Sequence, residues 1–177
     1  MQPTLNFVFI GLATCLFLSL LPRKVLNLFP QSWQSKCQES RNWTGAGWVG
    51  SIAGVATYVF LPPTLAQAWW MILAGVASSI FVGHYAERAF GSHDDPRIVI
   101  DEWIGAWIAC WGLAPQMGIP ILIALLCFRF FDVFKGPWGR KIQMLPGGFG
   151  IVLDDVAAGI LANISTLILL YLWVRLF

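Results

Sequence analysis

Two short polar stretches, joined by a loop that contains Gly and Pro, decide how this chain is read: Arg129-Phe130-Phe131-Asp132-Val133-Phe134-Lys135 and Gly147-Gly148-Phe149-Gly150-Ile151-Val152-Leu153-Asp154-Asp155. Apolar segments long enough to cross a bilayer flank them on both sides. Ionisable groups at such positions are costly, which makes them candidates for function. We therefore expect the region 129–155 to contribute to a site where membrane helices meet water.

Composition sets the class of protein. Of 177 residues, 58% are hydrophobic and 11% are charged, whereas a soluble domain carries about 25% charged residues. The deficit runs along the whole length, which predicts an all-α, polytopic membrane bundle rather than a soluble domain with one anchor. The net charge of +2, without a stripe of basic and aromatic residues, argues against a nucleic-acid partner.

Hydropathy predicts about six transmembrane helices, over residues 4–21, 48–61, 66–87, 100–114, 119–134 and 155–173. Basic residues follow the first of these segments and none precedes it, which favours an external N-terminus. Ten of the eleven Lys and Arg residues then fall on the cytoplasmic side, and so do all nine acids, which were not used for the assignment. The sequence thus predicts polar chemistry at the cytoplasmic leaflet.

Carboxylates are expected to meet at three helix ends. Asp101 and Glu102 begin one helix, Asp132 ends the next, and Asp154-Asp155 begin the last. Carboxylates brought together in an apolar setting repel one another, and a hard divalent cation such as Mg²⁺ removes that repulsion. The alternative explanations are that Asp154-Asp155 only stabilise a helix N-terminus and that Arg129 with Asp132 forms a structural ion pair.

An anion site is expected beside the acids. Gly147, Gly148 and Gly150 lead into a helix N-terminus, where backbone amides and the helix dipole favour phosphate. Arg129 and Lys135 add cationic donors. A metal, amides and cations together form the set of groups that phosphoryl transfer requires. The sequence lacks the Cys-x5-Arg, Asp-x-Asp-x-Thr and Ser-Gly-His motifs of other phosphatase classes.

Three blocks of this sequence resemble the signature blocks of the phosphatidylglycerophosphatase A family: 98–105 (Ile-Val-Ile-Asp-Glu-Trp-Ile-Gly), 128–135 (Phe-Arg-Phe-Phe-Asp-Val-Phe-Lys) and 147–159, which begins with the glycine run and ends at Gly159. The resemblance covers about residues 44–165. It divides the chain into 1–43, a helix and a loop outside the resemblance, and 44–177, a catalytic membrane domain. The family pattern Gly-Thr-x-Gly-Ser appears here as Gly47-Trp48-Val49-Gly50-Ser51, and Gly136 stands between Lys135 and Pro137.

The resemblance implies a multi-pass enzyme of the bacterial inner membrane that removes the terminal phosphate of phosphatidylglycerophosphate to give phosphatidylglycerol and depends on Mg²⁺. The residues that match the family acids are Asp94, Asp101, Glu102, Asp132, Asp154 and Asp155, and the matched cations are Arg129 and Lys135. The attacking group is either a metal-bound water or an aspartate that forms an aspartyl-phosphate. Competing hypotheses are a small cation transporter or channel and a non-catalytic subunit of a lipid-synthesis complex.

Overall fold

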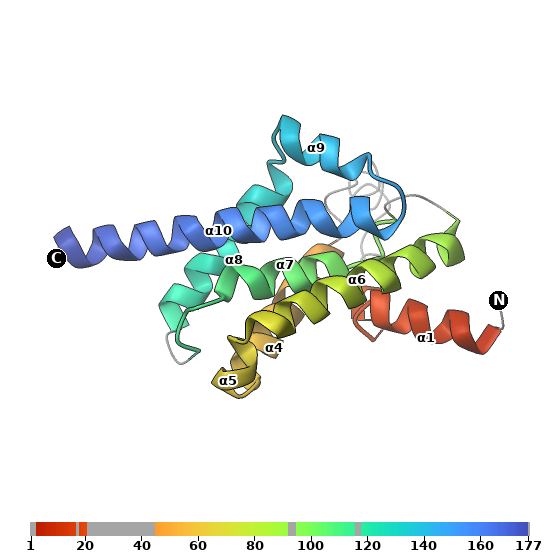
Figure 1. The fold of residues 1–177 in the computed structure, drawn as a ribbon, viewed down its shortest axis with the longest axis horizontal. Coiled ribbons are helices and arrows are strands. Elements are labelled where there is room, and N and C mark those ends of the chain that lie inside the picture. The colour runs from red at the N-terminus through yellow and green to blue at the C-terminus, as the bar shows by residue number, and fades with distance from the viewer. Residues whose placement is uncertain (1–2, 17, 21–44, 92–94, 116–117, 177) are drawn as a thin grey trace, which may run out of the picture.

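The computed structural model describes residues 3–16, 18–20, 45–91, 95–115 and 118–176, and within these ranges it contains helices and no strand (Figure 1). The prediction of an all-α fold is confirmed. The elements are α1 (Pro3–Ala13), the short 3-10 turn η1 (Leu18–Leu20), α4 (Ala46–Phe60), α5 (Pro63–Ala66), α6 (Trp69–Phe90), α7 (Ile100–Cys110), α8 (Gly118–Val133), α9 (Pro137–Gln143) and α10 (Gly148–Leu176).

The expected six crossings are not confirmed. Among the described helices, α6 with 22 residues and α10 with 29 are long and apolar enough to cross a membrane. The helix α7 has 11 residues and is therefore about 16 Å long, roughly half the thickness of a bilayer core. The helix expected over residues 4–21 ends at Ala13, because Cys15 and Leu16 take left-handed conformations with φ of 47° and 57°.

The helix α10 begins at Gly148, seven residues before the predicted start. The reason lies in its contact with α6. A Cβ on Gly148 would collide with the carbonyl oxygen of Ile80, and Gly147, with φ of +63°, faces the ring of His84. Only glycine allows this approach. As a consequence Asp154 and Asp155 lie in the second helical turn, behind the glycine run instead of at the helix start.

The helix α7 lies at the centre of the bundle and contacts α4, α6, α8 and α10. Its residues from Ile104 to Cys110 are all buried. A Cβ on Gly105 would lie 2.5 Å from the Phe128 ring, and one on Gly159 would lie 2.5 Å from the carbonyl oxygen of Gly105. These close approaches place the second turn of α7 beside the fourth turn of α10 and the later turns of α8.

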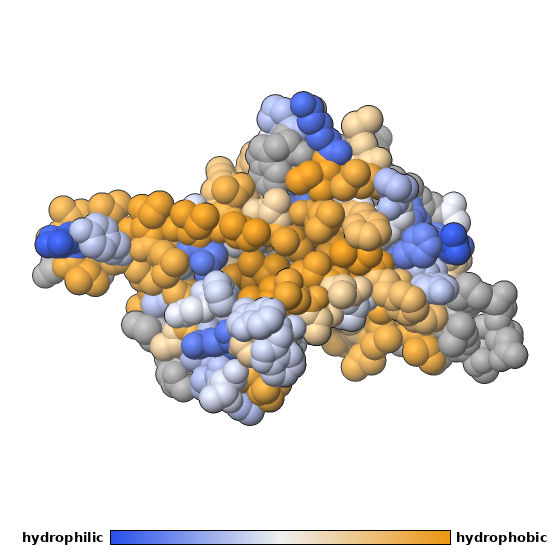
Figure 2. Space-filling model, in the orientation of Figure 1, coloured by the Kyte–Doolittle hydropathy of each residue, from blue (hydrophilic) through white to orange (hydrophobic). Residues whose placement is uncertain are grey.

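Large apolar side chains face outward along the helices. The second half of α10 projects beyond the other helices (Figure 1), and Figure 2 shows a hydrophobic surface along it. Exposed side chains follow one face of α8 and recur on the outer part of α10: Ile119, Leu122, Leu126, Phe130, Ile160, Ile164, Leu167 and Ile168. Continuous apolar surface of this kind marks contact with a membrane or a partner.

Candidate active site

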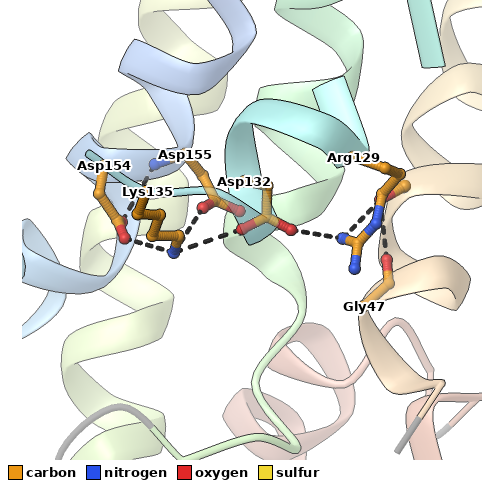
Figure 3. A network of polar contacts seen from close by, with 7 residues as sticks. Gly47, Arg129, Asp132, Lys135, Asp154 and Asp155 are labelled. Carbon is orange, nitrogen blue, oxygen red and sulfur yellow. Dashed lines mark hydrogen bonds and ion pairs between the residues drawn. The ribbon is translucent and has the colours of Figure 1, made fainter. Parts of the chain in front are cut away.

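Asp132 lies between two cations at the end of α8. Its Oδ2 is 2.6 Å from Arg129 Nη1 and its Oδ1 is 3.3 Å from Lys135 Nζ (Figure 3). Arg129 lies one turn before Asp132 on the helix, whereas Lys135 lies two residues beyond Val133, the last residue of α8. Asp132 is 9% exposed. Arg129, Asp132 and Lys135 therefore form a connected chain of ion pairs.

Lys135 connects this chain to α10. Its Nζ is 2.6 Å from Asp154 Oδ2 and 3.3 Å from Asp155 Oδ1, and both aspartates are 1% exposed (Figure 3). The three hydrogens of the ammonium group thus face three carboxylates. Burial lowers the pKa of Lys135, but Asp155, Asp154 and Asp132 raise it, and the balance holds this pKa well above its ordinary value. Lys135 is therefore a permanent cation at the centre of the site.

A second group consists of carboxylates alone. Asp101, Glu102 and Asp155 each offer one oxygen, and these three oxygens lie within 4.8 Å of one another. Asp101 and Glu102 come from the first turn of α7, and Asp155 comes from α10. Asp155 thus belongs both to this acid trio and to the ion pairs of Lys135. The structure thus brings together two segments that lie more than fifty residues apart in the sequence.

Buried polar atoms of opposite character remain without a hydrogen-bond partner in this site. Within the described residues, Glu102 Oε2 and Asp155 Oδ2 lack a donor, and Arg129 Nε lacks an acceptor. Native proteins rarely leave such atoms unsatisfied. The five acids and the two cations also leave three formal negative charges. Ion pairs among these residues therefore leave several groups unsatisfied. A bound cation would satisfy the carboxylate oxygens, and a bound anion would satisfy the arginine.

Two residues of α4 complete the surroundings of Arg129, and the sequence did not single them out as site residues. Arg129 Nη1 donates to Ser51 Oγ at 3.3 Å, and Ser51 Oγ donates to the carbonyl oxygen of Gly47 at 2.8 Å. A Cβ on Gly47 would lie 2.5 Å from Glu102 Oε1 and 3.0 Å from both terminal nitrogens of Arg129. Trp48 lies 5.4 Å from the guanidinium. The sequence feature that could have identified them is the segment Gly47-Trp48-Val49-Gly50-Ser51, which stands where the family has Gly-Thr-x-Gly-Ser.

The remaining sequence candidates lie elsewhere or make other contacts. Gly148 and Gly150 are buried, and the Gly150 amide donates to the carbonyl oxygen of Gly147, so this amide is already used. Asp94 lies outside the described residues. Its neighbour Asp95 is 7% exposed and accepts two hydrogen bonds from the Arg97 guanidinium, each at 2.7 Å. A phosphate-binding role of the glycine amides stays a prediction.

The donor set of the acid trio fits a hard cation. It consists of carboxylate oxygens, without a sulfur or imidazole ligand, and two of its residues present buried oxygens that make no hydrogen bond. Oxygen ligands are those that Mg²⁺ prefers. Asp132 and Asp154 lie outside the trio and are engaged by Arg129 and Lys135. The geometry therefore separates three candidate metal ligands from two acids that orient cations.

Comparisons with known proteins agree on one family. The family model described as phosphatidylglycerophosphatase A matches residues 32–170. A protein of Escherichia coli and one of Haemophilus influenzae, both named phosphatidylglycerophosphatase A, are 30% and 32% identical to this chain, over 66% and 69% of it and over 69% and 77% of their own lengths. A Bacteroides thetaiotaomicron protein named "Putative phosphatidylinositol-3-phosphatase" is 32% identical over 66% of this chain and 76% of that protein. No solved structure matches the chain.

Proposed function

This chain belongs to the phosphatidylglycerophosphatase A family and is a phosphatase, and we propose that it removes the terminal phosphate of phosphatidylglycerophosphate with the help of Mg²⁺ at the cytoplasmic leaflet of the membrane. The observation that carries the proposal is the pairing of unsatisfied groups. Buried carboxylate oxygens of Glu102 and Asp155 and the buried Nε of Arg129 belong to one network. A cation would satisfy the carboxylate oxygens, and a phosphate group would accept a hydrogen bond from Arg129 Nε.

The acid trio supplies the metal ligands in this proposal. Asp101, Glu102 and Asp155 would hold Mg²⁺ through carboxylate oxygens. When bound, the metal neutralises these acids and polarises a phosphoryl oxygen. Asp132 keeps Arg129 and Lys135 in place through its two oxygens. Asp154 holds Lys135 from α10. In this proposal three acids hold the metal, and the other two acids hold the two cations.

Arg129 is the principal phosphate ligand in this proposal. A guanidinium has five N–H donors in a planar fork that matches phosphate oxygens. Ser51 and Asp132 accept from one terminal nitrogen, while Nε stays available. Lys135 already faces three carboxylates, so it binds a phosphate oxygen only by releasing one of them. Lys135 therefore contributes mainly through its charge and through the positions of the acids.

In phosphate-ester hydrolysis the main task of the protein is to stabilise negative charge on the phosphoryl group. Hydrolysis forms a bond between phosphorus and a water oxygen and breaks the bond from phosphorus to the glycerol oxygen, which takes up a proton. The transferred group carries negative charge on three oxygens through the transition state. Preorganised donors that meet this charge in a site shielded from water lower the barrier. Arg129 is such a donor because Ser51, Asp132 and the α4 backbone fix its position.

The proposed location follows from charge and surface. The family and the two helices α6 and α10 indicate a membrane-associated protein. We propose a multi-pass protein of the bacterial inner membrane whose site faces the cytoplasm. The support is the placement of ten of eleven basic residues on that side in the expected topology. The acids of the site gather in early turns of α7 and α10 and at the end of α8, away from the projecting apolar half of α10 (Figure 1).

Phosphate release by the purified chain in detergent tests this proposal. We expect Mg²⁺-dependent release from phosphatidylglycerophosphate, loss of release in EDTA, and recovery when excess Mg²⁺ is added. Phosphatidylinositol 3-phosphate should be offered in parallel, because one relative carries a name for that activity. Undiminished release in EDTA would refute the metal mechanism. Release only from the inositol lipid would refute the proposed substrate while leaving the phosphatase assignment in place.

A further inference from the structure

An apolar cavity of about 400 Å³ is lined in part by Ile100 and Trp103, the residues that flank Asp101 and Glu102 of the acid trio in the sequence. It is bounded by the end of α1 and η1 through Leu12 and Leu18, by α4 through Ala53, by α6 through Val82, and by α7 through Ile100 and Trp103. Its volume falls in the range of small-molecule sites, about 300–1,000 Å³. The cavity contains none of the charged residues described above.

The helix α7 connects the cavity with the acid trio. Ile100 and Trp103 line the cavity, and Asp101 and Glu102 stand between them in the sequence. The residue before α7, Val99, donates its amide hydrogen to the carbonyl oxygen of Ala13 at 2.8 Å. This hydrogen bond ties the end of α1 to the start of α7. The apolar wall and the carboxylates are therefore parts of one rigid helix start.

The helix α4 provides a second connection. Gly47, Gly50 and Ala53 are spaced three residues apart, so they follow one another along roughly the same face. A Cβ on Gly47 would approach Glu102 Oε1 and Arg129, one on Gly50 would lie 3.2 Å from Glu102 Cβ, and Ala53 lines the cavity. Six residues of helix span about 9 Å. The cavity thus begins one to two helical turns from the phosphate-binding arginine.

We propose that this cavity holds one acyl chain of the lipid phosphomonoester while the acid trio and Arg129 hold its head group. The inference rests on the proposed function, since an amphiphilic substrate is what joins a polar site to an adjacent apolar cavity. Leu12 and Leu18 belong to a segment that precedes residues 32–170, the part matched by the family model. The segment before the family match would therefore shape tail selection in this chain.

Substrates with short acyl chains test the idea kinetically. For a chain transferred from water into an apolar cavity, each methylene strengthens binding by about fourfold, until the cavity is full. Ala53→Phe places a phenyl ring inside the cavity and so removes part of the space for an acyl chain. We expect it to raise KM for a dioctanoyl substrate at least tenfold. Hydrolysis of the head group without acyl chains should keep its kcat/KM. The matched control is Ala77→Phe, because Ala77 is exposed on α6 and does not line the cavity.

Photolabelling gives a readout that does not depend on turnover. A phosphatidylglycerophosphate analogue with a diazirine at the end of one acyl chain should label the peptides that contain Leu12 and Ala53. Ala53→Phe should reduce this labelling at least tenfold, while Ala77→Phe should not change it. Labelling confined to the outer faces of α8 and α10, or equal competition by diacylglycerol, which lacks the phosphate, would overturn the proposal.

The two proposals fail in different ways. If the wild type labels the cavity but releases no phosphate, the proposed function is refuted and the acyl-chain site stands. If it releases phosphate but does not label the cavity, the acyl-chain site is refuted and the proposed function stands. Ala53→Phe could also lose activity on the head group. In that case Leu12→Ala is the variant that tests the acyl-chain site, because it enlarges the cavity and changes a half-exposed side chain that folding tolerates more easily. We expect Leu12→Ala to move the preferred chain length upward. An unchanged preference would overturn the acyl-chain site.

Discussion

Asp154 and Asp155 are adjacent, equally buried and both paired with Lys135, yet the structure predicts different roles for them. Asp155 belongs to the acid trio with Asp101 and Glu102, whereas Asp154 lies outside it. Asp155→Asn should therefore weaken Mg²⁺ binding. Asp154→Asn should leave Mg²⁺ binding near the wild-type value and act through Lys135. The two variants make the same chemical change one residue apart, so each serves as the matched control for the other.

The magnitude follows from the spacing of the trio. Two unit charges 4.8 Å apart repel by roughly 3 kcal/mol at an effective dielectric constant of about 20. Asp155→Asn removes two of the three repulsions and loses one ion pair, to Lys135 at 3.3 Å. Because the two repulsions together outweigh the one attraction at the same dielectric constant, the variant without metal should be at least as stable as the wild type. If the lost ligand weakens Mg²⁺ binding by about 10–100-fold, the stabilisation at a concentration of 100 times the wild-type Kd falls from about 2.7 to about 0.4–1.4 kcal/mol.

Thermal unfolding with and without Mg²⁺ measures this difference, and phosphate release measures its consequence. We expect Asp155→Asn to lower kcat/KM by about 10²–10³-fold, to show a diminished Mg²⁺-dependent rise in Tm, and to keep its Tm in EDTA. Asp154→Asn should lower the Tm in EDTA, because Lys135 loses its partner at 2.6 Å, and should keep the Mg²⁺-dependent rise. Equal Mg²⁺ responses in the two variants would refute the division of the acids.

The other expected outcomes concern the arginine, the α4 glycine and the metal. Arg129→Lys should lower kcat/KM by about 10²-fold, because lysine ends in a single nitrogen and lacks the planar five-donor fork that lets one arginine nitrogen serve Ser51 and Asp132 while another faces a phosphate; Michaelis–Menten kinetics check this, and near-normal turnover would contradict it. Gly47→Ala should lower the rate of phosphate release at least about tenfold, because the added Cβ would displace Glu102 and Arg129. The control is Gly118→Ala, which has open space around its Cβ and should keep the wild-type rate of phosphate release. EDTA should abolish both turnover and retention of a non-hydrolysable phosphonate lipid in an equilibrium binding assay, and unchanged retention would argue against charge compensation by the metal.

The charged residues of the site could be recognised from the sequence because of the apolar background. Asp132 with its cations and Asp154-Asp155 stand out where only 11% of the residues are charged, and the hydrophobic segments around them predict helices. Their placement near helix ends then follows. The sequence did not divide the acids into metal ligands and cation partners, because that division depends on the packing of α7 against α10.

The breaks and early starts of helices were not predictable from hydropathy. The run 4–21 is apolar throughout, yet α1 stops at Ala13 and the chain turns at Cys15 and Leu16. The glycine run resembles a phosphate loop, yet Gly148 lets α10 pack directly on the backbone of α6 and begin early. At Gly148 a tertiary contact decides the outcome, and a window of sequence does not contain it.

The charge balance of the site links its two proposed ligands. With five acids against two cations, a phosphate dianion approaching Arg129 meets three excess negative charges in a buried setting. Like charges in such surroundings repel strongly. A divalent cation in the trio would cancel two of these three charges at the place where Asp155 joins the acids to Lys135. The same buried carboxylates that would bind the metal would therefore also repel the phosphate dianion until the metal is bound. In the proposed mechanism this coupling explains why the proposed phosphate site is lined mainly by acids.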